Sequence, residues 1–478
     1  MRFGIDFGTT HTVVALIDRG NYPIVSFEQG DAIPSVVSAD PDGELHFGHT
    51  EPGWATLRSF KRLLNDAHPD SEVSVGPVTL PLPDLLAGFL SHVREEILAH
   101  SNAGLRKKDA VEAAVSVPAN ASTAQRLMTM DAYRRAGFDV KAVLNEPSAA
   151  GFEYANRFRE TVTSKREYVL VYDLGGGTFD ASLIHMEGKS NEVVTSSGVS
   201  RLGGDDFDEA IALLVLAKRG GGSLTQHLLD DVRAQKEALG PNTRKFVVDE
   251  TVLPVDEVYA ACMPLVEQTL AAMEPAMRDP RRAGDEEIAW TELAGIYVVG
   301  GASAFPPVYR RLRERFGAHR VRRSPHPFGS CAIGLAIHLD EHKGYKLSER
   351  LSRHFGVFRE DDEGGRVSFD VLVPKDTPLP AQVSRRYRAA HNVGHYRFVE
   401  CGRIEAGRPE GNLAAWDEML FPFDPSLRGR DLAAVPIQRL GHGPEVEEIY
   451  QCGADGTVTA SLRVLDDGFE RTLQLSRR

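Results

Sequence analysis

Strands and helices alternate in the pattern of apolar and polar residues along the first part of the chain. Alternating apolar positions predict a strand, a turn and a second strand over residues 2–18, and the same arrangement again over residues 168–186. Residues 110–118 predict a further strand. The segments between these strands have helical periodicity, which predicts helices over residues 122–136, 206–219, 223–239 and 256–273.

The pattern changes after roughly residue 344. Apolar residues then alternate with polar ones over residues 367–373 and again over residues 458–464, and Asp-Gly turn signals bracket the second run. Such alternation is typical of antiparallel β-structure with one buried face. We therefore predict two domains, residues 1–345 and residues 346–478, the second of which is built of β-strands.

Two segments of the first domain repeat one pattern. FGIDFGTTHTVVALI, from Phe3, and LVYDLGGGTFDASLI, from Leu170, each contain an apolar strand, an aspartate, a glycine with small residues, and a second strand. Asp6 and Asp173 occupy the same place in the two copies. The repeat predicts two similar lobes within this domain.

Composition narrows the class of protein. The chain has 478 residues, of which 42% are hydrophobic, and a formal net charge of −13. No apolar run is long enough to span a membrane and the N-terminus lacks the segments of a signal peptide, so we expect a cytoplasmic protein. The negative charge argues against binding to nucleic acid or to a membrane surface. The four widely spaced cysteines argue against a zinc knuckle or a disulfide framework.

The turn of each repeat has the chemistry of a phosphate-binding loop. Glycines let the backbone approach a ligand closely, and successive N–H groups and threonine hydroxyls donate hydrogen bonds. Carboxylates beside such a loop would repel a triphosphate unless a hard cation lay between them, so Asp6 and Asp173 are candidates to hold a hydrated Mg²⁺. The run from Ile296 to Ala302 is a third apolar strand, which ends in two glycines before a predicted helix. No GxxxxGK[ST] sequence occurs, which excludes the P-loop class.

Five segments together resemble the nucleotide-binding domain of the heat shock protein 70 (DnaK-type) chaperone family. They are FGIDFGTT, VLNEPSAAG, LVYDLGGGTFD, RLGGDDFD and YVVGGASAFP, which follow one another near the family's spacing over residues 1–339. The resemblance implies an α/β fold, with a two-lobed actin-like (ribonuclease H-like) ATPase domain followed by a small antiparallel β-sandwich domain. It also implies that the chain binds ATP, ADP and Mg²⁺.

The resemblance gives roles to particular residues of this sequence. It implies that Asp6 and Asp173 position the Mg²⁺ through water. The residues that it implies for catalysis are Lys61, Glu146, Asp173, Thr178 and Asp180. The residues that it implies around the phosphates, ribose and adenine are Gly8, Thr9, Thr10, Gly175, Gly176, Gly177, Gly203, Gly204, Lys236, Gly300 and Gly301.

The part of the sequence that should recognise adenine departs from the family pattern. Where the family fixes ribose and adenine with a glutamate and an arginine, this chain has Arg233 and Glu237 on either side of the retained Lys236. Residues 302–304 replace a polar triplet with Ala-Ser-Ala. Loss of a stacking guanidinium costs about 1 to 2 kcal/mol, or roughly tenfold in affinity. We therefore expect either weaker adenine binding or a relaxed preference for the base.

The second domain resembles the family's substrate-binding β-sandwich at RVSFDVLVPKDTPLP and ADGTVTASLRVLD. The resemblance implies unfolded polypeptide or a dedicated protein client as partner, together with a J-domain protein and a nucleotide exchange factor. The linking segment KGYKLSERLSRHFGVF is basic and amphipathic, whereas the family has a short acidic linker, so the coupling of the domains is expected to differ. We expect no helical lid after the β-domain.

These observations predict a slow ATPase that acts as an Hsp70-like molecular chaperone. Two alternatives stay open. A kinase of a sugar-type small molecule is one, because such kinases share the two hairpins. A nucleotide-gated scaffold without hydrolysis is the other, because the adenine-contacting arginines are missing.

Overall fold

The computed structural model describes residues 1–65, 68, 70–240, 242–282, 286–361, 365–416 and 418–473. It divides into two compact units, which we describe separately. The first unit comprises residues 1–65, 71–120 and 129–347, and the second comprises residues 66–70, 121–128 and 348–478. The first unit is a mixed α/β structure, which confirms the predicted class, whereas residues 348–473 contain β-strands and short 3-10 turns.

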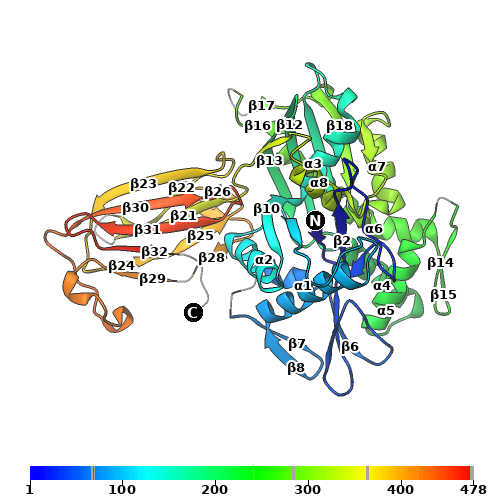
Figure 1. Ribbon diagram of the computed structural model, residues 1–478, viewed down its shortest axis with the longest axis horizontal. Helices are drawn as coiled ribbons and strands as arrows, with labels where there is room; N and C mark the ends of the chain where they lie inside the picture. The colour runs from blue at the N-terminus through cyan, green and yellow to red at the C-terminus, as the bar shows by residue number, and fades with distance from the viewer. Residues whose placement is uncertain are drawn as a thin grey trace. The chain divides into compact units, whose positions relative to one another are not determined.

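Two sheets form the frame of the first unit (Figure 1). The first sheet has the strand order β10 (Asp139–Asn145), β9 (Glu112–Val117), β1 (Arg2–Phe7), β2 (His11–Leu16) and β3 (Ile33–Pro34). The second sheet has the order β19 (Val321–Arg323), β18 (Leu293–Val299), β11 (Tyr168–Leu174), β12 (Phe179–Glu187), β13 (Ser190–Val199) and β20 (Lys346–Ser348).

Both predicted hairpins are confirmed, and they occupy matching places in the two sheets. β1 pairs with β2 in antiparallel fashion, and β11 pairs with β12 in the same way. On its other side β1 pairs with the parallel strand β9, as β11 does with the parallel strand β18. The sequence repeat therefore corresponds to a repeated arrangement of three strands.

The predicted helices are confirmed, whereas α1, α3 and α8 were not predicted from the sequence. The segments predicted over residues 122–136, 206–219, 223–239 and 256–273 form α2, α4, α5 and α6 with small shifts at their ends. The full set is α1 (Leu82–Ala99), α2 (Thr123–Arg135), α3 (Glu146–Arg157), α4 (Gly204–Arg219), α5 (Gln226–Glu237), α6 (Val255–Met273), α7 (Pro306–Phe316) and α8 (Ser330–Leu339).

The strand β11 is buried along its whole length and apolar except for Asp173, because both of its faces are covered. Alternate side chains of a strand point to opposite faces. Val169 accordingly packs in a cluster with residues of α3 and α8, whereas Leu170 packs in a cluster with residues of α4, α6 and α7. The helices α3 and α8 cross closely because Gly334 has no side chain. A Cβ at that position would lie 1.7 Å from the carbonyl oxygen of Ala149.

Short β-segments of the first unit lie outside the two large sheets. They are β4 (Val36–Ala39), β5 (Leu45–Phe47) and β6 (Ala55–Arg58) in one small sheet, and the hairpins β7 (Glu72–Val75) with β8 (Val78–Pro81), β14 (Lys245–Val248) with β15 (Thr251–Pro254), and β16 (Arg278–Asp279) with β17 (Glu286–Glu287).

The second unit contains two four-stranded sheets and two hairpins. One sheet has the order β22 (Arg366–Val373), β21 (His354–Asp361), β25 (Phe398–Cys401) and β28 (Ala414–Ala415). The other has the order β23 (Ala381–Arg388), β30 (Glu445–Cys452), β31 (Val458–Val464) and β32 (Glu470–Leu473). The hairpins are β24 (Val393–Tyr396) with β29 (Met419–Pro422) and β26 (Arg403–Glu405) with β27 (Arg408–Glu410). The two alternating runs of the sequence are β22 and β31, as predicted.

Among the residues that the structure describes, no helix is both long enough and apolar enough to cross a membrane. All four cysteines are buried free thiols. The end of the chain, residues 474–478, to which the expectation about a helical lid refers, lies outside the described residues.

Candidate functional site

The turns of the two hairpins of the first unit lie against each other. In the first turn the N–H of Gly8 donates to the carbonyl oxygen of His11 at 3.1 Å. A Cβ on Gly176 would lie 2.4 Å from Cγ2 of Thr10, and a Cβ on Gly177 would lie 2.8 Å from Cγ2 of Thr9. A side chain at Gly176 or Gly177 would collide with these threonines. The predicted residues of the first loop and of the second loop therefore lie in direct contact, through backbone and small side chains.

The beginning of α4 joins the second turn. The N–H groups of Gly204 and Asp205 donate to the carbonyl oxygens of Gly175 and Gly176, at 3.0 Å and 2.8 Å. A Cβ on Gly203 would lie 2.6 Å from the carbonyl oxygen of Gly176. The glycine pair before α4 therefore lies directly on the second loop, and the positive end of the α4 dipole faces this region.

The third glycine pair, at the end of β18, reaches the same place from the other side. Gly300 has a φ of +82°, and a Cβ there would lie 2.4 Å from Oδ1 of Asp173. A side chain at this position would therefore displace the aspartate. The neighbouring Gly301 packs against the ring of Phe328 instead, since a Cβ there would lie 2.6 Å from Cε1 of that ring.

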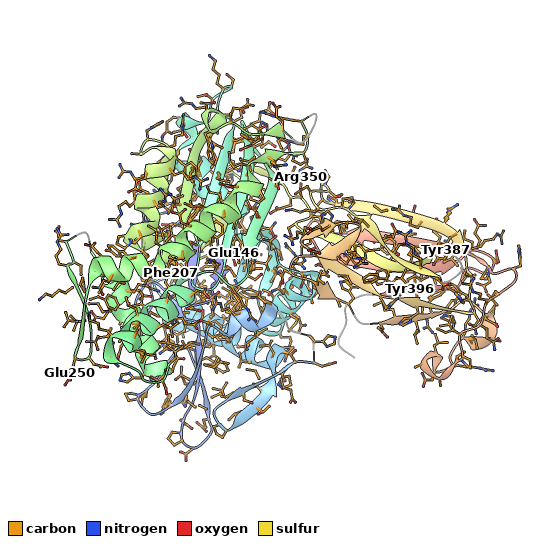
Figure 2. All side chains as sticks on the ribbon, turned by 180° about the vertical axis from the view of Figure 1, so that it is seen from behind. Glu146, Phe207, Glu250, Arg350, Tyr387 and Tyr396 are labelled. Carbon is orange, nitrogen blue, oxygen red and sulfur yellow. The ribbon has the colours of Figure 1, made fainter. Side chains whose placement is uncertain are left out.

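Four carboxylates and one ammonium group gather behind the turns. Asp173 and Asp180 are buried and face each other across the register of β11 and β12. Asp6, at the end of β1, accepts a hydrogen bond of 2.8 Å from Oγ of Ser116 on β9. Figure 2 labels Glu146, the first residue of α3, inside the first unit. Lys61 is the cation that acts on Asp6 and Asp180 among the described residues, so carboxylates outnumber cations in this cluster.

Lys61 lies in the 3-10 turn Phe60–Asn65. Its Nζ lies 2.7 Å from Oε1 of Glu146, and both side chains are buried. Burial lowers the pKa of Lys61, but the carboxylates of Glu146 and Asp6 more than offset it, so that the pKa lies above its usual value. The lysine therefore stays protonated in the interior of the unit.

The aspartates of the cluster hold their protons more tightly than aspartates in water. Loss of hydration, and then the charge of Glu146, raises the pKa of Asp6 to about 6 and that of Asp180 to about 7. The same two causes raise the pKa of Asp173 well above its ordinary value. Thr178 donates a hydrogen bond to Asp180, which opposes part of the rise. A cation at this cluster would favour the ionised carboxylates, so the donor set suits a hard divalent ion.

Arg233 and Lys236, at positions predicted to lie near ribose and adenine, are engaged in ion pairs within the protein. Arg233 lies 2.8 Å from Oδ1 of Asp205 and 2.9 Å from Oδ2 of Asp208. Nζ of Lys236 lies 2.6 Å from Oδ1 of Asp208 and donates to the carbonyl oxygen of Gly204 at 2.8 Å. Glu237 is exposed. The structure thus places Lys236 beside the α4 glycines, although its charge is already matched by a buried aspartate.

The sequence interpretation missed several residues of the site, among them Ser116, Arg62 and Cys331. Arg62 donates to the carbonyl oxygen of Gly177 at 3.0 Å and to Oδ2 of Asp206 at 2.6 Å, so it ties the 3-10 turn to the second loop. Its position next to Lys61 and the acidic run before α4 could have indicated such a pair. Cys331, which was given no role in the site from the sequence, lies with Sγ 3.7 Å from Oδ2 of Asp173, and no sequence signal indicates this contact.

Comparisons with known proteins agree on one family. A family model described as Hsp70 protein matches residues 71–236. The chain is 30% identical over 506 residues to the chaperone protein HscA homolog of Azotobacter vinelandii, which covers 99% of this chain and 77% of that protein. It is 29% identical over 514 residues to the HscA homolog of Polynucleobacter asymbioticus, with the same coverage of 99% and 77%. It is 30% identical over 430 residues to that of Acidithiobacillus ferrooxidans, covering 81% of this chain and 66% of the relative.

Proposed function

Because the chain belongs to the heat shock protein 70 family, we propose that it is an ATP-driven molecular chaperone whose first unit hydrolyses ATP and whose second unit binds polypeptide. The observation that carries this proposal is the contact between the two glycine and threonine turns, directly in front of a carboxylate cluster. The turns offer donors for phosphate oxygens, and the carboxylates suit the divalent cation that accompanies a nucleoside triphosphate.

The proposal includes the finer fold. The two sheets with their matching hairpins support a two-lobed, actin-like arrangement of the first domain, residues 1–345. The two four-stranded sheets of residues 348–473 support a β-sandwich for the second domain, residues 346–478. In this arrangement each lobe contributes one phosphate loop.

We assign the Mg²⁺ to Asp6 and Asp173. Burial and the neighbouring carboxylates raise the pKa of both groups, and a cation bound between them would favour their charged forms. When bound, Mg²⁺ would neutralise charge on the phosphate oxygens. The hydrogen bond from Ser116 holds Asp6 in place, and the thiol of Cys331 does the same for Asp173.

The remaining polar residues act on the terminal phosphate and on water. Lys61, held by its 2.7 Å contact with Glu146, offers an ammonium group to the charge that develops on the transferred phosphoryl group. Asp180 has a pKa near neutrality and is positioned by Thr178, so it is suited to accept a proton from water. With positioning and electrostatics alone and no covalent intermediate, we expect slow turnover.

A scaffold that binds nucleotide without hydrolysis is the second candidate. It is favoured by the ion pairs of Arg233 and Lys236, which occupy side chains that would otherwise contact the sugar and base. The partner remains a protein client in either case, since the relatives are named as chaperone proteins. A J-domain protein and a nucleotide exchange factor are proposed as further partners on family grounds.

An ATP turnover assay tests this function. It compares the wild type with Asp173→Asn and with the control variant Asp42→Asn. Asp173 is buried in the cluster, whereas Asp42 is an exposed carboxylate of the same unit. We expect release of phosphate by the wild type and by Asp42→Asn, and turnover reduced to background in Asp173→Asn. Nucleotide binding with no phosphate release in the wild type would favour the scaffold, and phosphate transfer to a sugar would favour a kinase.

A further inference from the structure

The second unit contains a concave site with a cavity of about 700 Å³. Residues of β21, β22, β23 and β24 line it, and these strands are labelled in Figure 1. Tyr387 of β23 and Tyr396 of β24 lie close together there, as Figure 2 shows, with their hydroxyl oxygens 2.5 Å apart. A cavity of this size accommodates a few side chains of a peptide.

A saturated polar network holds the tyrosines in place. Glu448 of β30, whose side chain is 0% exposed, accepts hydrogen bonds from Tyr387 at 2.6 Å and from Tyr450 at 2.7 Å. Arg359 of β21 lies 2.6 Å from the same carboxylate and neutralises it. Because each of these polar groups has a hydrogen-bond or ion-pair partner, the floor of the cavity is preorganised.

The rim of the cavity is basic. Five arginines and one glutamate line the cavity, in a chain whose net charge is −13. We use the name basic rim for Arg385, Arg386, Arg388 and Arg397. The glutamate of the lining, Glu360, is matched by an ion pair with Arg439.

Two arginines of the basic rim have unmatched charge. Arg388 contacts the ring of His442 and the carbonyl oxygen of Gly443, and Arg397 lies over the ring of Phe358. Neither forms an ion pair with a carboxylate of the described residues. The charges of the other two are at least partly matched. Arg386 lies 2.6 Å from Glu447, whereas Arg385 lies 4.0 Å from Asp370, a carboxylate that already pairs with Arg359.

Apolar side chains and a free strand edge accompany the basic rim. Val367 and Ile437 line the cavity and are each 56% exposed, so both offer apolar surface to a ligand. β23, which carries three of the rim arginines, is the end strand of its sheet in the described strand order. An edge strand offers backbone N–H and C=O groups to an extended segment.

We propose that this concave site binds an extended polypeptide segment in which aspartate or glutamate side chains flank an apolar one. The carboxylates would pair with Arg388 and Arg397, since arginine forms strong charge-assisted hydrogen bonds with carboxylates. The apolar side chain would cover Val367 and Ile437. A long nucleic acid fits less well, because the rest of this chain carries excess negative charge and would repel its phosphates. The inference rests on the proposed function only in taking this unit as the polypeptide-binding part.

Fluorescence anisotropy with the full chain tests the ligand class. The probes are a short fluorescein-labelled peptide with leucine and phenylalanine at its centre and glutamates on both sides, and the same peptide with lysines in place of the glutamates. We expect the wild type to bind the glutamate peptide about tenfold or more tightly than the lysine peptide at low salt. Arg388 and Arg397 gain carboxylate partners from the glutamate peptide, whereas the lysine peptide brings ammonium groups that repel them.

Charge reversal provides the matched variants. Arg388→Glu combined with Arg397→Glu should invert the preference, since both arginines are exposed and their replacement leaves the floor intact. Arg463→Glu, an exposed arginine of β31 outside the cavity, should leave the preference unchanged. The wild type's own choice between the two peptides tests the inference even if the double variant does not fold.

The outcomes separate this inference from the proposed function when ATP turnover is measured on the same preparation. Equal or tighter binding of the lysine peptide by an active ATPase overturns the inference alone. Displacement of the glutamate peptide by a single-stranded oligonucleotide, at a lower concentration than by unlabelled peptide, also overturns it. Preference for the glutamate peptide in a chain that neither binds nor hydrolyses ATP supports the inference, while the proposed function fails.

Discussion

Replacement of Asp180 by asparagine should stabilise the metal-free protein, and increasingly so as the pH rises. Loss of hydration, and then the charge of Glu146, raises the pKa of Asp180 from 3.8 to about 7. The folded state therefore holds this proton more tightly than the unfolded chain. The stability that follows is fully present below about pH 4 and is lost as the pH rises through 7. Asparagine has nearly the same shape and removes the charge.

The magnitude follows from the size of the pKa change. A tenfold change in an equilibrium constant corresponds to about 1.4 kcal/mol, so the ionised Asp180 costs about 4 kcal/mol well above pH 7. The cost is already partly present at pH 5, where only the unfolded chain ionises. The difference in unfolding free energy between Asp180→Asn and the wild type should thus grow by roughly 2 to 3 kcal/mol between pH 5 and pH 8.

Urea unfolding followed by circular dichroism measures this difference, because the long helices α1, α4, α5 and α6 of the first unit dominate the helical signal. Asp42→Asn, an exposed carboxylate, should show no comparable dependence on pH. A difference between Asp180→Asn and the wild type that stays constant from pH 5 to pH 8 would refute the reasoning, because it would mean that Asp180 titrates alike in the folded and unfolded states. Added Mg²⁺ and ATP should narrow the difference by favouring the ionised carboxylates of the wild type.

Three further predictions concern single positions. Gly300→Ala should cost about 1 to 3 kcal/mol, since its φ is +82°, and should abolish nucleotide binding in isothermal titration, because the added methyl group displaces Asp173. Lys61→Met should cost roughly 3 to 5 kcal/mol in urea unfolding by leaving Glu146 without a partner, and the double variant with Glu146→Gln should recover much of this loss. Glu448→Gln should destabilise the second unit by about 3 kcal/mol, measured in urea unfolding by the fluorescence of Trp416, while ATP turnover stays unchanged.

Much of the local structure was predictable because it depends on short-range patterns. The hairpins β1 with β2 and β11 with β12 were predicted from alternating apolar residues around glycine turns, and the structure confirms both. The same holds for α4, α5 and α6, whose helical spacing is strong. The carboxylates of Asp6 and Asp173 were identified because each is the second-to-last residue of a strand at the same place in a repeat, which brings them to corresponding ends of two sheets.

The contacts of the site depended on long-range packing and could not be predicted. Cys331 lies on α8 beside Asp173, and Arg62 reaches the second loop only because the 3-10 turn lies against it. The basic cavity is the clearest case: the sequence shows its arginines as ordinary polar positions of several strands. Their convergence depends on how β21, β22, β23 and β24 are arranged.

The amino-acid sequence by itself determined the two hairpins, the helices α2, α4, α5 and α6, the repeat and the residue types at the two turns, because these features depend on neighbours along the chain. Only the tertiary structure decided which charges are matched. Lys61 and Glu146 neutralise each other in the interior, Asp180 is left with a raised pKa, and Arg388 lacks a carboxylate partner among the described residues. Charge balance depends on distances and burial between segments far apart in sequence, and these are set only when the elements pack.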